Sequence, residues 1–293
     1  MAFARNGDVE IYFETFGSPA DPALLLVNGL GSQSISYRVA FCERLVDLGH
    51  FVIRYDNRDV GLSSMFDDAF TDVGGALKAL AAGEPADVPY LLSDMAADGI
   101  GVLDVLGIQR AHVMGASMGG MIVQTMAIEH PERLLTMTSL MSTTGDPDVG
   151  QPTPEAWDLL LARPPTDRDT FVVRQLDGAR TWGSPHCFDQ DRLTAFAKEA
   201  FERSFNPAGV ARQYLAVQAS GSRSASLGDV KVPTLVLHGD ADTLIDVSGG
   251  RRTAEVIPGA TFVLIEGMGH DYPPEFWDQL TGLVYAHTSQ VHE

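Results

Sequence analysis

Ser117 lies in the stretch Gly115-Ala116-Ser117-Met118-Gly119, which is a G-x-S-x-G turn. A serine hydroxyl becomes an effective nucleophile only when a base takes its proton and a carboxylate orients that base. Glycines on both sides permit a turn too sharp for larger side chains, and such a turn lifts the hydroxyl clear of the sheet. We therefore interpret Ser117 as a candidate nucleophile. The alternative is a turn that only connects a strand to a helix.

Two later loops supply a candidate base and candidate acids. His270 ends the glycine loop after the apolar run 261–265, while Asp240 and Asp242 follow the apolar run 232–237, with Asp246 a few residues further on. The chain order serine, carboxylate, histidine is one of those in which catalytic triads occur. The residues alone leave the choice of acid open. They also allow His270 to be a capping or solvated loop histidine.

The elements that must position these loops follow from the hydrophobic pattern. Continuous apolar runs are typical of strands that helices cover on both faces. Residues 23–27 are such a run, and the chain has further predicted strands at 9–15, 51–55, 111–116, 134–141, 232–237 and 261–265, with the first of these, 9–15, at a sheet edge. Helical spacing predicts helices at 37–48, 76–82, 93–106, 118–130, 249–257 and 274–287. The alternation predicts an α/β fold with a mainly parallel central sheet flanked by helices.

The alternation stops between residues 142 and 227, where prolines separate helical pieces rich in aromatic residues. Because strands and helices alternate again afterwards, we predict a core at 1–141 and 228–293 with an inserted helical cap at 142–227. A cap inserted between sheet strands would lie over Ser117 and line an apolar pocket. Its aromatic residues would also pack against one another.

Composition restricts the partners. The chain has 293 residues, 45% of them hydrophobic, and a formal net charge of −19. A strongly acidic protein is unsuited to nucleic acid or to an anionic membrane surface. No apolar run is long enough to span a bilayer, and residues 1–8 lack the pattern of a signal peptide. We expect no nucleic-acid or membrane partner, and the oligomeric state stays open.

Cys42 and Cys187 are the two cysteines, and they form no C-x-x-C pair. They are interpreted as reduced thiols of a cytoplasmic protein. His186 stands beside Cys187, but no further ligand lies near this pair in the sequence, so we expect no metal site. We also expect no cofactor.

Four motifs together resemble the α/β-hydrolase superfamily: Asn28-Gly29-Leu30-Gly31, the turn at Ser117, His238-Gly239-Asp240-Ala241-Asp242 and Gly267-Met268-Gly269-His270. Their order over nearly the whole chain outside the insertion implies the α/β-hydrolase fold. The resemblance implies Ser117 as nucleophile, His270 as base and Asp242 as acid, with Asp240 ordering its loop.

The same resemblance places the oxyanion-hole donors at the backbone N–H groups of Leu30 and Met118. Such donors receive the charge that develops on a substrate oxygen. Asn28 stands where histidine is usual in the family. The donors are backbone groups, so the hole should survive this change, which affects the hydrogen bonds that brace the loop.

Within the superfamily, the chain is similar to esterases of the aclacinomycin-methylesterase type. The similar stretches are residues 19–27, 52–59 and 267–270, which are mostly scaffold segments. We expect Arg58 and Asp59, in the second of them, to pin a loop behind the site.

The predicted function is a cofactor-independent serine hydrolase that acts through an acyl-enzyme on a small to medium apolar carboxylic ester. A cofactor-free haloperoxidase or perhydrolase, a lactonase and a carbon–carbon bond hydrolase could use the same triad. A non-catalytic small-molecule receptor is the alternative from a different class. Dehalogenases and epoxide hydrolases of this fold are disfavoured, because they carry aspartate at the position of Ser117.

Overall fold

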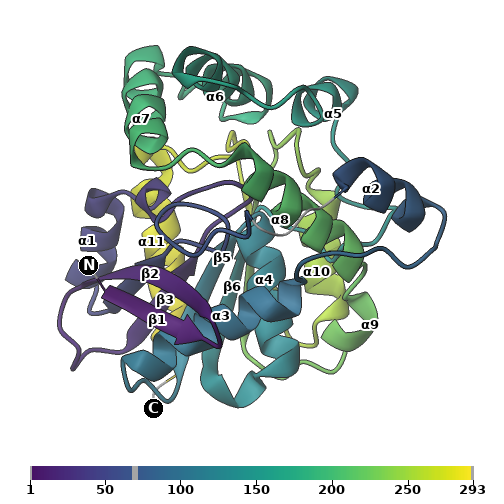
Figure 1. Cartoon of the computed structure of the whole chain (residues 1–293). Coiled ribbons are helices and arrows are strands. Elements are labelled where there is room, and N and C mark those ends of the chain that lie inside the picture. Colours follow the sequence, from purple (N-terminus) through teal and green to yellow (C-terminus); the bar gives the residue numbers. More distant parts are fainter. Residues whose placement is uncertain (1, 68–71, 292–293) are drawn as a thin grey trace.

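One sheet forms the centre of the molecule in the computed structural model, which describes residues 2–67 and 72–291 (Figure 1). Its order in the described residues is β1-β2-β4-β3-β5-β6-β7-β8. The strands are β1 (Ala2–Asn6), β2 (Val9–Phe16), β3 (Ala23–Val27), β4 (Phe51–Tyr55), β5 (Ala111–Ala116), β6 (Leu134–Leu140), β7 (Thr234–Gly239) and β8 (Thr261–Ile265). β2 pairs antiparallel with β1 and β4, and the other neighbours are parallel. The predicted α/β fold with a mainly parallel sheet is confirmed.

The prediction that the first strand lies at the sheet edge is wrong. β1 pairs antiparallel with β2 and takes the edge position itself. The sequence carried a signal for this hairpin, because the two-residue loop Gly7-Asp8 begins with a glycine, and Gly7 adopts a φ of 59°. β1 itself lacks a continuous apolar run, so the hydrophobic pattern did not indicate it. Ala4 is its one buried residue.

Helices cover both faces of the sheet. α1 (Val39–Asp47) and α11 (Pro274–Thr288) share one hydrophobic cluster, and α3 (Leu92–Val105) and α4 (Met118–Glu129) share a second. Strand β3 shows how the sheet separates the two clusters. Leu24 and Leu26 belong to the first cluster and Leu25 to the second, because successive side chains of a strand point to opposite faces.

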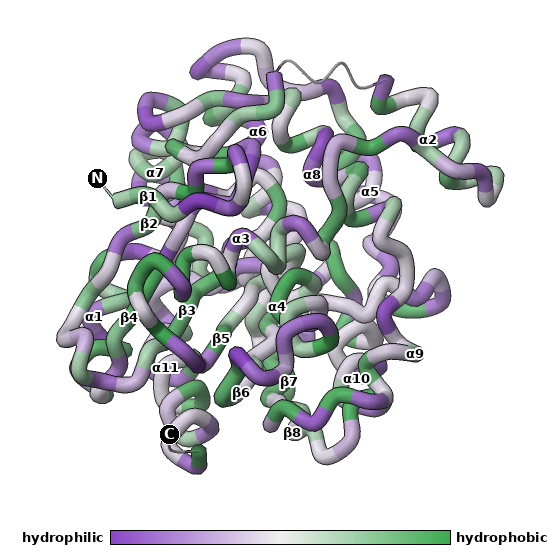
Figure 2. Tube along the Cα trace, turned by 60° about the horizontal axis from the view of Figure 1, so that its bottom comes forward, coloured by the Kyte–Doolittle hydropathy of each residue, from purple (hydrophilic) through white to green (hydrophobic). Residues whose placement is uncertain are grey.

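The remaining core helices are α10 (Ser248–Val256), which packs against β7 and β8, and α2 (Val73–Ala81), which packs against α8. Hydrophobic residues concentrate along the inner strands and α4 (Figure 2). Within residues 2–67 and 72–291, no helix combines the length and apolar character needed to cross a membrane.

The segment 142–227 contains helices and no strand. Its helices are α5 (Pro154–Leu160), α6 (Arg168–Trp182), α7 (Gln190–Arg203), α8 (Pro207–Ser220) and α9 (Ser224–Leu227). α5, α6 and α7 gather at the top of Figure 1, above the sheet, whereas α9 packs against α10 and α4. The division into core and cap at residues 142 and 227 stays a prediction.

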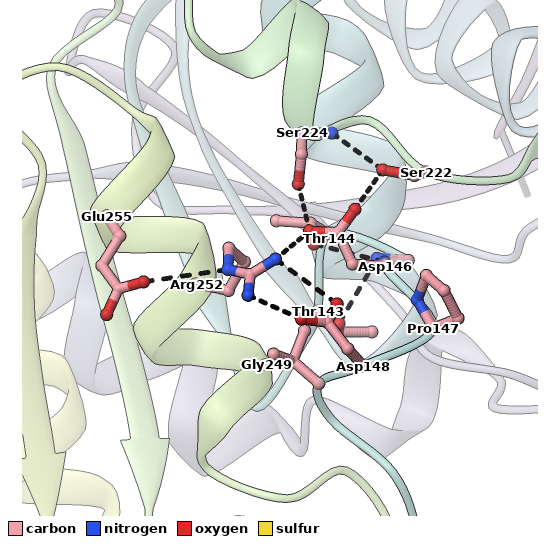
Figure 3. Close-up of polar contacts among 12 residues, drawn as sticks. Thr143, Thr144, Asp146, Pro147, Asp148, Ser222, Ser224, Gly249, Arg252 and Glu255 are labelled. Carbon is pink, nitrogen blue, oxygen red and sulfur yellow. Dashed lines mark hydrogen bonds and ion pairs between the residues drawn. The ribbon is translucent and has the colours of Figure 1, made fainter.

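The chain enters and leaves this segment at one place (Figure 3). The Arg223 backbone N–H donates to the Thr144 carbonyl at 2.9 Å. The Asp146 carboxylate accepts hydrogen bonds from the Ser222 and Ser224 hydroxyls and from Arg252 of α10. Both ends of the inserted segment are thereby tied to each other and to the core.

Candidate active site

The turn after β5 holds Ser117 in a conformation that few residues adopt. Its φ of 56° and ψ of −121° lie outside the regions favoured by residues with a side chain, as expected of a strained functional turn. The flanking glycines are required. A Cβ at Gly115 would lie 2.0 Å from the Gly119 carbonyl oxygen, and a Cβ at Gly119 would lie 2.1 Å from the Val27 carbonyl oxygen.

The structure brings the three predicted side chains into one hydrogen-bonded chain. The Ser117 Oγ lies 2.9 Å from His270 Nε2, and His270 Nδ1 lies 2.7 Å from Asp242 Oδ2. The Asp242 side chain is fully buried, and that of His270 is 8% exposed. A proton on Nδ1 shared with the carboxylate leaves Nε2 free to accept the serine proton. These contacts connect the ends of β5, β7 and β8.

Asp242 is held in its ionised form. Its Oδ1 accepts the backbone N–H groups of Leu244 and Ile245, each at 2.9 Å. Burial raises the pKa of this carboxyl, but the charge of His270 and hydrogen bonds from His238 and His270 outweigh burial and lower the pKa to about 2. The carboxylate can therefore orient the His270 ring and stabilise its protonated form.

The other two acidic candidates make different contacts. Asp240 Oδ1 accepts the Gly267 N–H at 2.7 Å, which ties the loop after β7 to the loop after β8. Asp246 accepts the Ser248 N–H at 2.9 Å at the start of α10. Asp240 thus orders its loop, as expected from the resemblance.

The contact of His238 with Asp242 was missed in the sequence analysis, which names this histidine only as part of a motif. Its Nε2 lies 2.8 Å from the Ile245 carbonyl oxygen and 3.4 Å from Asp242 Oδ2, in a fully buried position. The ring packs directly on the backbone of α10, since a Cβ at Gly250 would lie 2.4 Å from its Nδ1. The signal was the spacing of four residues between His238 and Asp242.

The predicted oxyanion loop lies against Ser117. A Cβ at Gly29 would lie 3.2 Å from the Ser117 Cβ. In the described part of the chain, the backbone N–H groups of Leu30 and Met118 donate to no protein acceptor. A free N–H is expected at Met118, the first residue of α4. Two donors are thus available beside Ser117.

Asn28 braces this loop from the core. Its Nδ2 donates to the Tyr55 carbonyl at 3.2 Å, and its own carbonyl accepts Asn57 Nδ2 at 3.0 Å. These bonds join the loop after β3 to the end of β4. Asn28 therefore supplies a bracing hydrogen bond to the loop.

The inserted segment holds the loop of His270. The His270 N–H donates to the Trp182 carbonyl at the end of α6, and the Gly269 N–H donates to Ser184 Oγ at 3.0 Å. Asp271 accepts the Ser184 N–H at 3.0 Å, and burial raises the pKa of Asp271 above its usual value. The position of His270 thus depends on residues 182–184.

Arg58 and Asp59 have the structural role expected of them. Arg58 Nε and Nη2 each lie 2.7 Å from a carboxylate oxygen of buried Asp98 on α3. Asp59 accepts Arg212 of α8 and, at 2.7 Å, the Tyr90 hydroxyl. Both pairs fix the loop that follows β4.

The cysteines and the other histidines make simple packing and hydrogen-bond contacts where the structure describes them. No group of three or more His, Cys, Asp or Glu residues suited to a metal occurs in residues 2–67 and 72–291. Cys42 is buried, which raises its thiol pKa to about 12, and Cys187 is also a free thiol. His112 is buried, with its Nδ1 2.9 Å from Thr136 Oγ1.

Comparison with known proteins agrees with this geometry. Rhodomycin D methylesterase DauP of Streptomyces sp. (strain C5) is 32% identical over 303 residues, covering 96% of this chain and 95% of the relative. Rhodomycin D methylesterase DnrP of Streptomyces peucetius is also 32% identical, covering 97% and 96%. The predicted likeness to esterases of the aclacinomycin-methylesterase type is confirmed.

Solved structures share the fold. A meta-cleavage product hydrolase from Pseudomonas fluorescens IP01 aligns with a TM-score of 0.78 at 18% identity, covering 99% of this chain and 98% of that one. The family described as the alpha/beta hydrolase fold matches residues 22–273. This chain belongs to the alpha/beta hydrolase fold family.

Proposed function

We propose that this chain hydrolyses carboxylic esters through an acyl-enzyme on Ser117, and that its substrates are methyl esters of apolar acids. The hydrogen-bonded chain from Ser117 through His270 to Asp242 carries the proposal. The methyl ester follows the two relatives that are named methylesterases and that the chain matches at 32% identity.

In the proposed first half-reaction, Ser117 Oγ attacks the ester carbon while His270 Nε2 takes the hydroxyl proton. The carbonyl electron pair moves onto oxygen and gives a tetrahedral oxyanion. As the carbonyl forms again, the bond to the alcohol oxygen breaks, and His270 gives its proton to that oxygen. Methanol leaves, and the acyl group stays on Ser117.

In the second half-reaction, His270 takes a proton from water, and the resulting oxygen nucleophile attacks the acyl carbon. Collapse of the second oxyanion releases the acid and returns the proton to Ser117. The N–H groups of Leu30 and Met118 receive the oxyanion in both halves. Their freedom from other acceptors in the described residues, together with the contact of Gly29 with Ser117, supports this role.

The test is hydrolysis of p-nitrophenyl esters from acetate to octanoate, together with methanol release from methyl octanoate. Wild type is compared with Ser117→Ala and with Ser93→Ala, a serine on α3 that takes no part in the hydrogen bonds among Ser117, His270 and Asp242. We expect Ser117→Ala to lower kcat by about 10⁴-fold or more, and Ser93→Ala to keep wild-type rates.

A burst of p-nitrophenol in wild type would support the acyl-enzyme. Folded wild type without turnover on any ester would contradict the proposal and favour carbon–carbon bond hydrolysis or a receptor. Undiminished turnover by Ser117→Ala would contradict the assignment of the nucleophile.

A further inference from the structure

Gln213 of α8 connects two loops at the site through one side chain. Its Oε1 accepts the Gly31 N–H at 2.9 Å, and its Nε2 donates to the Arg58 carbonyl at 2.7 Å. The side chain is fully buried. The amide oxygen thus hydrogen-bonds to the loop after β3, and the amide nitrogen hydrogen-bonds to the loop after β4.

Gly31 directly follows Leu30, whose N–H is one of the proposed oxyanion donors. Gly31 has a φ of 66°, a left-handed conformation that a glycine adopts without strain. Because a peptide unit is planar, fixing the Gly31 N–H also fixes the Leu30 carbonyl. The Gln213 acceptor therefore restrains the backbone on one side of Leu30.

The other side-chain hydrogen bonds to this loop come from the core. Asn28 and Asn57 connect the loop to the end of β4. Of the side chains that the structure describes, Gln213 is the one from the inserted segment that hydrogen-bonds to residues 28–31. It reaches Gly31 from α8.

Helix α8, which carries Gln213, is held firmly against the loop after β4. The neighbouring Arg212 makes two hydrogen bonds to the carboxylate of Asp59. Gly209 packs so closely that a Cβ there would lie 2.2 Å from the Asp59 carbonyl oxygen. Val210 lies against Gly31, at 3.0 Å from the position of an added Cβ. The helix therefore reaches the oxyanion loop by packing as well as by a hydrogen bond.

We propose that Gln213 is a positioning residue that sets the orientation of the Leu30 N–H, so that the inserted segment completes the oxyanion hole. This inference rests on the ester hydrolysis proposed above. Gln213 itself contacts the loop and not the reacting atoms. It acts in the transition state, when the oxyanion forms, and has little effect on substrate binding.

The experiment compares wild type, Gln213→Met and Gln124→Met on p-nitrophenyl octanoate. Methionine keeps the length of glutamine and removes both hydrogen bonds. Gln124 is a matched control, because it is also fully buried on a helix and accepts Arg223 Nε at 3.1 Å, away from the oxyanion loop. Thermal unfolding measures the loss of stability in each variant.

We expect Gln213→Met to lower kcat by about 10- to 100-fold, less than the complete loss of an oxyanion donor, with KM within about threefold of wild type. Trifluoromethyl octyl ketone, which forms a tetrahedral adduct with a reactive serine, should bind more weakly by the factor lost in kcat/KM. Gln124→Met should keep kcat and the affinity for the ketone.

Two results would overturn the inference while leaving the proposed function intact: turnover that depends on Ser117 with unchanged kcat in Gln213→Met, or a rise in KM alone. Absence of Ser117-dependent turnover in wild type would instead refute the proposed function. If Gln213→Met does not fold, Gln213→Asn takes its place, because its shorter amide cannot span both loops. Wild-type kcat in that variant would equally overturn the inference.

Discussion

Arg212 and Asp59 form a buried ion pair with two hydrogen bonds, Nε to Oδ2 at 2.8 Å and Nη2 to Oδ1 at 2.7 Å. The pair joins α8 of the inserted segment to the loop after β4. Asp59 has a φ of 68°, so the loop is held in a left-handed turn at the position of its carboxylate. This part of the inserted segment is fixed to the core.

Arg212→Leu should therefore destabilise the fold strongly. Removing one partner of a buried ion pair leaves the other charge unpaired, at a cost of about 3–5 kcal/mol. The measurement is the free energy of unfolding in urea. Adding Asp59→Asn should restore part of the loss, because asparagine tolerates the left-handed conformation and carries no charge.

The matched control is Arg168→Leu, since Arg168 pairs with Glu202 at the surface, where the two side chains are 47% and 64% exposed. An exposed pair contributes about 0–1 kcal/mol. Equal losses of stability in Arg168→Leu and Arg212→Leu would show that the pair with Asp59 does not fix α8.

The low pKa of Asp242 predicts a stability change in acid. Burial raises this pKa, but the charge and hydrogen bonds of the two histidines lower it to about 2, against about 3.9 for an unfolded chain. The unfolded state therefore binds the proton more tightly. The resulting stabilisation is complete above about pH 4 and is lost as the pH falls through about 2.

We expect wild type to lose about 2 kcal/mol more than Asp242→Asn between pH 5 and pH 2, measured by urea unfolding. Asp242→Asn should also lower kcat by about 10⁴-fold at pH 7, because the His270 tautomer is no longer fixed. His270→Ala should reduce the acid-dependent loss, since it removes a charge that lowers the pKa. Identical pH profiles of stability in wild type and Asp242→Asn would contradict this account.

Gly119 has no room for a side chain. A Cβ there would lie 2.1 Å from the Val27 carbonyl oxygen and 2.8 Å from the Asn28 carbonyl oxygen. Gly119→Ala should therefore destabilise the fold by about 1–3 kcal/mol and lower kcat, because the backbone beside Ser117 must move. Thermal unfolding and ester hydrolysis check both effects.

Gly282 is the control for the same substitution in open space. It lies inside α11, and nothing is within 4 Å of an added Cβ. Gly282→Ala should stabilise the fold by about 0.5–1 kcal/mol, since glycine is unfavourable inside a helix, and should keep kcat. A Gly119→Ala variant as stable and active as Gly282→Ala would show that the turn accommodates a side chain.

The parts of the site that the sequence predicts are those with a local pattern. The family, the fold and an ester hydrolase are confirmed. They could be predicted because a buried apolar strand followed by a short motif identifies each loop. Asp242 and His270 stand on such loops, and the structure places both within hydrogen-bond distance of each other. Their catalytic roles stay predictions.

The contacts from the inserted segment could not be predicted in the same way. Arg212 and Gln213 stand on a helix where charged and polar residues normally face water, yet both are buried against loops more than 150 residues earlier. No local spacing indicates such a contact. His238 did have a spacing signal, but a histidine at a strand end is more often a packed core residue.

Asp146 should matter more to stability than its neighbour Asp148, although both contact Arg252 (Figure 3). Desolvation raises the pKa of Asp146, but hydrogen bonds from Ser222, Ser224 and Arg252 lower it to about 2. Its side chain is 12% exposed, whereas that of Asp148 is 65% exposed. Asp146 therefore holds the two ends of the inserted segment together, and Asp148 contributes one surface contact.

Asp146→Ala should cost about 1–3 kcal/mol, because two hydroxyl groups and a guanidinium lose a shared acceptor. Asp148→Ala should change the free energy of unfolding by less than about 0.5 kcal/mol. Urea unfolding of both variants at pH 7 measures the difference, and repeating it near pH 2 should reduce the gap, because protonation removes the charge of Asp146 in wild type. Equal effects of the two substitutions at pH 7 would mean that the junction does not depend on Asp146, and that the pair of Arg223 with Thr144 holds the ends of the segment instead.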